Sequence, residues 1–406
     1  MIPADLGAEL ARAITAAVTS GDFPPAARGV TQAGTWRPAG PGGYASSLPF
    51  GLAAVTGEPP AQIARQLARR IEPVTWIVSA RATGAGYLTV TVTPAALAAL
   101  APRMVAAGPG CARGDSLRGA TRPAPPLPDL ATAPDWHTAW QDQAAALAGR
   151  LAQAAGAATT HDFGPERLVS GTRPRDSGLG TVADAVAFAG ADAVRCALSR
   201  IPADRPADVA SYAHALDAAR HAGLTAAFRE LPPELPSAAL SAEPPSYPRE
   251  PERQQTRFCC RSSGSKSEFT AAGASREGST VAFAHADAAS VLRWGAELGL
   301  APGEWPATPP DYAEPELAVL TRLSWLPERV GAAARRECPA EFPRYLEALA
   351  SDWRECRERC PALPFGGRSA PRAQPETAAR LWLADAVRVA LAAGLGLIGV
   401  TARDRL

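Results

Sequence analysis

Lysine, histidine and cysteine are scarce in this chain, and their scarcity excludes several kinds of site. Lys266 is the only lysine, so arginine carries nearly all of the positive charge. The seven cysteines form no CxxC pair and the five histidines lie far apart, so the sequence predicts neither a zinc site nor a disulfide framework. Cys356 and Cys360 lie one helical turn apart, but no further ligands accompany them. We expect no metal, no cofactor and a reducing, cytoplasmic environment.

The sequence also predicts neither a secretory leader nor an uninterrupted membrane span. The first residues, MIPADLGAELARAITAAV, include early acidic residues and no basic n-region. The apolar stretch Leu381–Val400 contains Asp385 and Arg388 well inside it, and charges at that depth are costly in a bilayer. We therefore expect no membrane partner.

The chain has no marked excess of positive charge. Its 41 basic residues face 40 acidic ones. Residues 281–406 hold 15 arginines against 16 acidic residues, and residues 1–99 hold seven against five. Nucleic-acid-binding proteins usually present a basic face, so any such face must arise here from clustering in three dimensions.

What is present is enough apolar material for two or three domains. The chain has 406 residues, of which 47% are hydrophobic and 20% charged, and this composition excludes wholesale disorder. Residues 1–104 predict a small α+β domain. Helical spacing covers 3–20, Pro59-Pro60 opens the amphipathic segment AQIARQLARRI, and a Gly84/Gly86 turn separates two β-type runs, Val74–Ala80 and Tyr87–Val92.

The central part of the chain reads as linkers around limited structure. Residues 105–159 predict a linker with one helix at Trp136–Gly156, and residues 160–230 are mixed with helical patches. Residues 231–280 are rich in Pro, Ser, Gly and Arg and predict a disordered linker or an insertion.

Residues 281–406 carry consistently helical apolar spacing. Each predicted helix has one apolar stripe that it cannot bury alone, so together the helices should form a bundle. The predicted fold class is therefore an α+β N-terminal domain followed by a mainly α remainder that ends in a helical bundle, with flexible linkers between them.

Three stretches resemble arginyl-tRNA synthetase, in the order of that family. Gly43-Tyr44-Ala45-Ser46-Ser47 and the following PPAQIARQLARRI resemble its N-terminal appended domain, and Gly84–Val90 resembles its G-P-G-F-I-N-F strand. Thr181–Asp184 and Gly190–Arg195 resemble the segment after its second catalytic signature. The last stretch, from VAFAHAD at 281–287 to GLGLIGV at 394–400, resembles its DALR anticodon-binding domain.

The catalytic parts of that family have no counterpart in the sequence. No H-x-G-H pair occurs among the histidines, which are His137, His161, His214, His221 and His285. The stretch Leu168–Pro174, where the family has a lysine-bearing loop that neutralises ATP phosphates, contains no lysine. About 75 residues separate the N-terminal domain from the middle match, where a nucleotide-binding α/β domain needs well over 100. The resemblance thus implies no catalytic residue in this chain.

The resemblance implies contacts with tRNA at eight positions. They are Tyr44, Phe283, His285, Arg329, Arg335, Arg336, Arg380 and Arg388. Tyr44 is the candidate for contact with the tRNA backbone, since the family's N-terminal domain leans on the D-loop elbow. Phe283 keeps the ring of the family's tyrosine and loses its hydroxyl.

Each of these positions also has a purely structural interpretation. The spacing of His285 places it on an apolar helix face, which favours a packed core histidine. The arginines at 329, 335 and 336 form either a phosphate-binding cluster or a solvated helix face paired with Glu328 and Glu337. Arg380 and Arg388, eight residues apart, project to a similar side, but Arg380 belongs to the "ARL" match and can be structural.

Two departures from the family pattern count against recognition of an arginine anticodon. Asp287 replaces an arginine and reverses its charge. Cys356-Arg357 replace an aromatic pair, so the stacking of an unpaired base on a ring is lost.

Three functions follow as hypotheses. The first is a tRNA-binding paralogue of arginyl-tRNA synthetase that lacks an aminoacylation site and acts as a carrier, sensor or accessory factor. Its expected partners are tRNA, with arginine tRNA as the first candidate, and a synthetase or another tRNA-dependent enzyme, but not DNA. The second is arginine–tRNA ligase activity retained with a partner that supplies the active site. The third is a protein-interaction scaffold without RNA.

Overall fold

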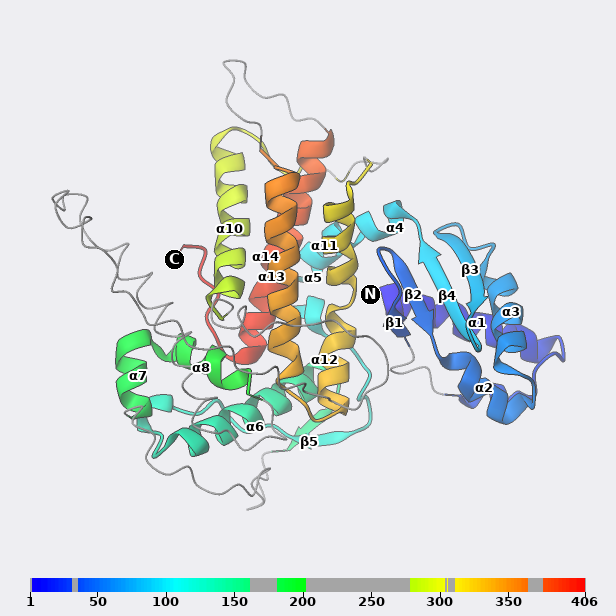
Figure 1. The fold of residues 1–406 in the computed structure, drawn as a ribbon, viewed down its shortest axis with the longest axis horizontal. Helices are drawn as coiled ribbons and strands as arrows, with labels where there is room; N and C mark the ends of the chain where they lie inside the picture. Colours follow the sequence, from blue (N-terminus) through cyan, green and yellow to red (C-terminus); the bar gives the residue numbers. More distant parts are fainter. Residues whose placement is uncertain are drawn as a thin grey trace, which may run out of the picture.

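The computed structural model describes residues 2–30, 36–160, 181–201, 278–303, 305, 311–363 and 375–405. Figure 1 shows a small sheet-containing domain at one side of a larger helical body. The segment 231–280, expected to be a disordered linker or insertion, lies outside the described residues except for its last three, which begin a helix. Most of 160–230 lies outside them too.

The N-terminal domain is a four-stranded antiparallel sheet with helices against one face. Its helices are α1 (Ile2–Thr19), η1 (Pro25–Gly29), α2 (Leu48–Thr56), α3 (Pro60–Ile71), α4 (Pro94–Ala98) and α5 (Leu100–Ala107), and its strands are β1 (Trp36–Pro38), β2 (Gly43–Ser46), β3 (Ile77–Thr83) and β4 (Tyr87–Val92). The strand order is β1-β2-β4-β3. The predicted α+β class is confirmed. Residues 44–54 begin in strand β2 and continue into helix α2.

Alternation along β4 decides which face of the sheet is covered. Leu88, Val90 and Val92 are buried and share a core with α3, whereas Thr89 and Thr91 between them face the other side. Helix α1 packs on α3, on the covered side. The opposite face of the sheet thus carries the polar half of the alternating pattern.

The region expected to be a linker packs tightly instead. It contains η2 (Gly108–Ala112), β5 (Thr121–Pro123), η3 (Leu130–Thr132), α6 (Trp136–Ala154) and β6 (Ala158–Thr160). Cys111 and Ala112 of η2 are buried against the helical bundle, and β5 pairs in parallel with β6. Small residues make this possible, because at Gly149 a Cβ would stand 2.5 Å from Ala124 Cα. This segment is therefore ordered by its packing against α6 and the bundle, despite its Pro- and Gly-rich composition.

The helical body combines the predicted bundle with two short helices. The bundle consists of α10 (Gly278–Glu297), α11 (Glu314–Ser324), α12 (Leu326–Arg335), α13 (Glu341–Arg359) and α14 (Pro375–Ile398), and α7 (Val182–Ala189) and α8 (Ala191–Ser199) pack with α6. Two described stretches, Pro94–Ala112 and Glu376–Ile398, are long and apolar enough to cross a membrane. In the second, 61% of the residues are buried within the protein, as in the core helix of a bundle.

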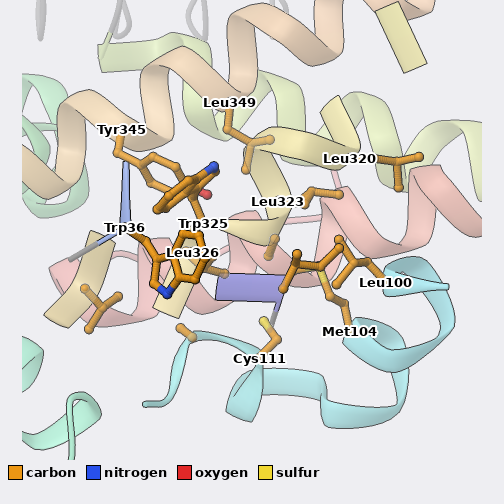
Figure 2. Packing of buried hydrophobic residues seen from close by; sticks show 14 of the residues in the cluster. Trp36, Leu100, Met104, Cys111, Leu320, Leu323, Trp325, Leu326, Tyr345 and Leu349 are labelled. Atoms are coloured by element: carbon orange, nitrogen blue, oxygen red, sulfur yellow. The ribbon is translucent and has the colours of Figure 1, made fainter. Parts of the chain in front are cut away.

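One apolar core runs through both domains. Figure 2 shows Trp36, Leu100 and Met104 from the N-terminal side lying among Leu323, Trp325 and other side chains of the helices. In the described residues the two tRNA-synthetase-like parts thus pack against each other, which corrects the expectation of separated modules.

Candidate functional site

The junction between the two domains is built around Tyr44. Its side chain is fully buried, its ring stacks on Trp325 with centroids 5.3 Å apart, and its hydroxyl lies 2.7 Å from Ser324 Oγ. Because the Ser324 hydroxyl donates to the Thr321 carbonyl, Tyr44 is the donor in this pair. Beside it, the Gly42 amide donates to Thr321 Oγ1 at 3.0 Å. Tyr44 therefore holds the domains together, which corrects the expectation that it faces tRNA.

Arg329 also contacts the ring of Trp325. Its guanidinium lies 5.7 Å from the centre of the Trp325 ring, and burial lowers its pKa. It lines a cavity of about 230 Å³ between the β1–β2 turn and helices α11–α13, together with Arg322 and Asp352, which pair at 2.7 Å. Arg329 has no carboxylate within ion-pair distance in the described part of the chain.

The other predicted arginines on the bundle are engaged by acidic side chains. Arg335 pairs with Glu328 at 3.0 Å and Arg336 with Glu341 at 2.9 Å. The alternative of a paired helix face thus describes these two arginines, although Glu337 pairs with Arg122 instead. They do not form one phosphate-binding cluster with Arg329.

Arg380 is structural in this fold. Its Nε donates at 2.7 Å to the buried carboxylate of Glu316, and its Nη1 donates to the Pro361 carbonyl at 3.1 Å. The second oxygen of Glu316 accepts from the Ala313 amide and caps α11. Arg380 therefore ties α14 to α11. Arg388, expected on a similar side, pairs with Asp385 and lies at the margin of a separate groove.

His285 is a packed core residue. It is 2% exposed, and its Nδ1 lies 3.1 Å from the Arg403 carbonyl oxygen. Burial lowers the pKa of the imidazole, against the opposing effects of that carbonyl and of Asp404. Phe283, two residues earlier on α10, is half-buried. Neither side chain presents a free polar group to a ligand in the described structure.

The two departures from the family pattern contact each other. Asp287 accepts from Arg357 Nε at 3.2 Å and from Trp353 Nε1 at 2.9 Å. The reversed charge and the replaced aromatic residue thus form one ion pair between α10 and α13. This pair neutralises a surface that would otherwise carry a free cation.

The open face of the N-terminal sheet was missed by sequence reasoning and carries free cations. Strand register places Arg37, Ala45, Thr89 and Arg81 in one row across all four strands, on the face away from α3. Arg37 and Arg81 are exposed, and in the described residues neither has a carboxylate partner. Three strand spacings separate them, which is about 14 Å.

We define the open face as the row Arg37–Ala45–Thr89–Arg81 together with the neighbouring residues Ser79, Thr83, Tyr87 and Thr91. An aromatic pair lies at the margin of this face. Tyr87 contacts Phe50 of α2 edge-to-face, with ring centroids 5.0 Å apart. Both rings are more than a third exposed. The sequence indicated a polar sheet face through the alternating threonines of YLTVTV, Thr89 and Thr91. Only the strand register shows that Thr89 lies in one row with the two arginines.

Comparison with known proteins identifies both ends of the chain. Residues 6–92 match the arginyl-tRNA synthetase N-terminal domain, and residues 281–406 match the DALR anticodon-binding domain. An arginine–tRNA ligase from Frankia alni is 39% identical over 127 residues, covering 31% of this chain and 22% of that protein. One from Micrococcus luteus is 34% identical over 170 residues, covering 40% and 30% respectively.

The chain spans less than a third of the length of these curated relatives. The solved arginyl-tRNA synthetase of Thermus thermophilus aligns over 100% of both chains at 16% identity, with a TM-score of 0.48. Taken together, the sequence matches show that the chain carries an arginyl-tRNA synthetase N-terminal domain and a DALR anticodon-binding domain, and that it is homologous to arginine–tRNA ligases.

Proposed function

We propose that this protein binds tRNA through the open face of its N-terminal sheet, as an arginyl-tRNA synthetase paralogue without an aminoacylation site of its own. The observation that carries the proposal is the row from Arg37 to Arg81, with unpaired arginines at both ends of a polar strip, in a domain homologous to one of arginine–tRNA ligases. Its role is that of a tRNA carrier, sensor or accessory factor.

The chemistry of the open face suits the backbone of a folded RNA. Ala45 and Thr89 in the middle of the row are small, so a ribose-phosphate chain can approach the sheet closely between the two guanidinium groups. Arginine binds phosphate in a bidentate manner, and threonine hydroxyls hydrogen-bond phosphate or 2′-hydroxyl groups. Tyr87 and Phe50 offer exposed ring surface on which one unstacked base can lie.

The helical domain contributes less free positive charge to this interaction. Arg335, Arg336 and Arg357 are each held by an acidic side chain, so phosphate would have to compete with that carboxylate. The Arg336–Glu341 pair is exposed and the other two pairs are partly buried. Ion pairs near the surface are typically worth about 1 kcal/mol or less, which makes the competition possible but leaves little net attraction. We therefore assign the larger electrostatic share of tRNA binding to the N-terminal domain.

Aminoacylation by this chain alone is not part of the proposal. The sequence between the two matched domains contains no H-x-G-H motif, and its described part consists of helices and one two-stranded sheet. Arginine-dependent ATP–pyrophosphate exchange by the purified protein, alone or with a partner, would support retained ligase activity instead.

The test is filter binding of total cellular tRNA at low and high salt, with sequencing of the retained species. Arg37→Ala combined with Arg81→Ala should weaken retention roughly tenfold and reduce its salt dependence. Arg12→Ala is the matched control, because Arg12 is exposed on α1, pairs with Glu9 and lies on the covered side of the sheet.

Two results would redirect the assignment. Equal weakening by the control variant would indicate a diffuse charge effect and not a site. No retention above a neutral protein at low salt would reject tRNA binding, and the bundle would then be read as a surface for another protein.

A further inference from the structure

A second basic site lies where the DALR-matched domain meets the segment before it, which neither family model covers. It is a groove of about 1000 Å³ between η2, the end of α6 and the C-terminal half of α14. Three arginines line it: Arg113 directly after η2, Arg150 of α6 and Arg388 of α14. Arg113 and Arg150 lie between residues 92 and 281, beyond the ranges of the two family matches.

The floor of the groove is made of small residues. Gly108, Ala112, Ala393 and Gly396 are among them, and a Cβ added at Gly396 would meet nothing within 4 Å. The backbone is therefore open to a ligand along this stretch of α14. A volume of this size holds a ligand as large as a nucleotide or a short run of a phosphodiester chain.

Each arginine keeps hydrogen-bonding capacity for a ligand. Arg150 donates through Nε and Nη2 to the carbonyls of Leu397 and Gly396 at the end of α14, which fixes its position and leaves Nη1. Arg388 uses Nε and Nη2 on Asp385 and likewise keeps Nη1. Arg113, just after η2, is exposed and has no ion pair with any described carboxylate.

All the charged residues that line the groove are positive. Asp385, the partner of Arg388, is not among the lining residues, and nearby Asp115 pairs with Arg118 at 3.2 Å. With Arg388 offset by Asp385, the groove retains about two net positive charges in a chain whose net charge is only +1. Such local concentration of one sign attracts an anion with several negative charges.

We propose that this groove binds a phosphate-bearing ligand, with Arg150 as a fixed anchor and with Arg113 and Arg388 contributing further guanidinium groups along the same groove. Arginine is suited to this because its planar guanidinium matches phosphate oxygens. The phosphates come either from the backbone of an RNA or from a free nucleotide, and the two sources share this chemistry. The inference does not depend on tRNA binding by the sheet face.

The test uses fluorescence anisotropy of the full chain with a fluorescein-labelled pentauridylate and with a fluorescent ATP analogue as separate probes. Arg113→Ala should weaken binding of the bound probe roughly tenfold. Gly396→Glu, which places a carboxylate in open space of the groove, should weaken it at least as much. Arg118→Ala is the matched control, since Arg118 is exposed in the same segment but outside the groove. Circular dichroism confirms that each variant is folded.

The outcomes separate the two phosphate sources. If the pentanucleotide binds, and the slope of log K against log salt concentration becomes shallower by about 0.7 in Arg113→Ala, the groove binds an RNA backbone. If the ATP analogue binds and both groove variants weaken it, the groove takes a free nucleotide. If neither probe binds, or if the control weakens binding as much as the groove variants, the proposal is wrong.

The same variants distinguish this site from the proposed function. If the groove variants still retain tRNA and neither small probe binds, the groove proposal is wrong and the tRNA proposal stands. Binding of a probe by a protein that retains no tRNA rejects the tRNA proposal and leaves the groove standing.

Discussion

The hydrogen bond between Tyr44 and Ser324 should couple the stability of the two domains. Tyr44→Phe removes the donor and leaves Ser324 Oγ, which still donates to Thr321, without its incoming bond. We expect this to cost about 1 kcal/mol of unfolding free energy. Ser324→Ala leaves the fully buried Tyr44 hydroxyl without an acceptor, and the expected cost is about 2 kcal/mol.

The double variant decides whether these costs belong to one interaction. When both partners are absent no orphaned group remains, so the combined loss should fall short of the sum by about 1 kcal/mol. The assay is urea unfolding of the full chain, followed by far-UV circular dichroism for the helices and by hydrogen exchange of the strand amides. The two probes should report one transition, because a single core spans both domains.

The ionisation of Tyr44 adds a second signature to the same experiment. Burial raises its pKa well above the usual value, so the folded protein keeps the hydroxyl neutral. The unfolded chain ionises near its ordinary pKa of about 10, so this contribution is complete below pH 10 and is lost as pH rises further. Tyr44→Phe should reduce the alkaline loss of stability. Additive single costs, two separate transitions, or an unchanged alkaline slope would refute the coupling.

Two further predictions concern the helical bundle. Because burial depresses the pKa of His285, the folded state disfavours its protonation, so stability should be intact above about pH 6.5 and decline as pH falls. Melting temperatures between pH 8 and pH 5 should show a shallower decline in His285→Asn, and an equal decline would reject this cause. Asp287→Ala should cost about 1–3 kcal/mol, because it orphans the indole N–H of buried Trp353. Arg357→Ala should cost less than about 1 kcal/mol in the same denaturation assay, and the reverse order would contradict the assigned roles.

Local patterns predicted the elements well where one physical signal acted alone. The run AQIARQLARRI, with proline at its start, gave α3 at Pro60–Ile71, and the alternation of YLTVTV gave β4 at Tyr87–Val92. The helix predicted at Trp136–Gly156 forms as α6, but residues 105–134 were predicted as a linker and are ordered instead, because glycine and proline are common both in flexible linkers and in ordered connections. A flexible linker and an ordered connection can be told apart here only from the surfaces of α6 and α14 against which the segment packs.

The candidate site was less predictable for the same reason. Tyr44 lies in a motif that points to tRNA, but its environment depends on Ser324, which is 280 residues away along the chain, and on the next residue, Trp325. Conversely, Arg37 and Arg81 belong to no motif and become neighbours in function only through strand register. Residues far apart in sequence carry no local signal of their contact, so burial and charge pairing had to come from the fold.

The shared core also changes how the proposed tRNA recognition has to work. Two modules on a flexible linker gain affinity through effective concentration and tolerate ligands of varied shape. Here the Gly42–Thr321 and Tyr44–Ser324 bonds hold the N-terminal sheet against α11 and α12, so the open face and the bundle keep one fixed relative position. Because folding already fixes the two surfaces relative to each other, less conformational entropy is lost when a ligand binds. A ligand that contacts both surfaces has to match the distance between them. A rigid pair of surfaces therefore selects by overall shape more than by base identity. This form of recognition is consistent with the bundle, where the Asp287–Arg357 ion pair stands at positions that hold an arginine and an aromatic residue in the family, so that less is available there for reading a base.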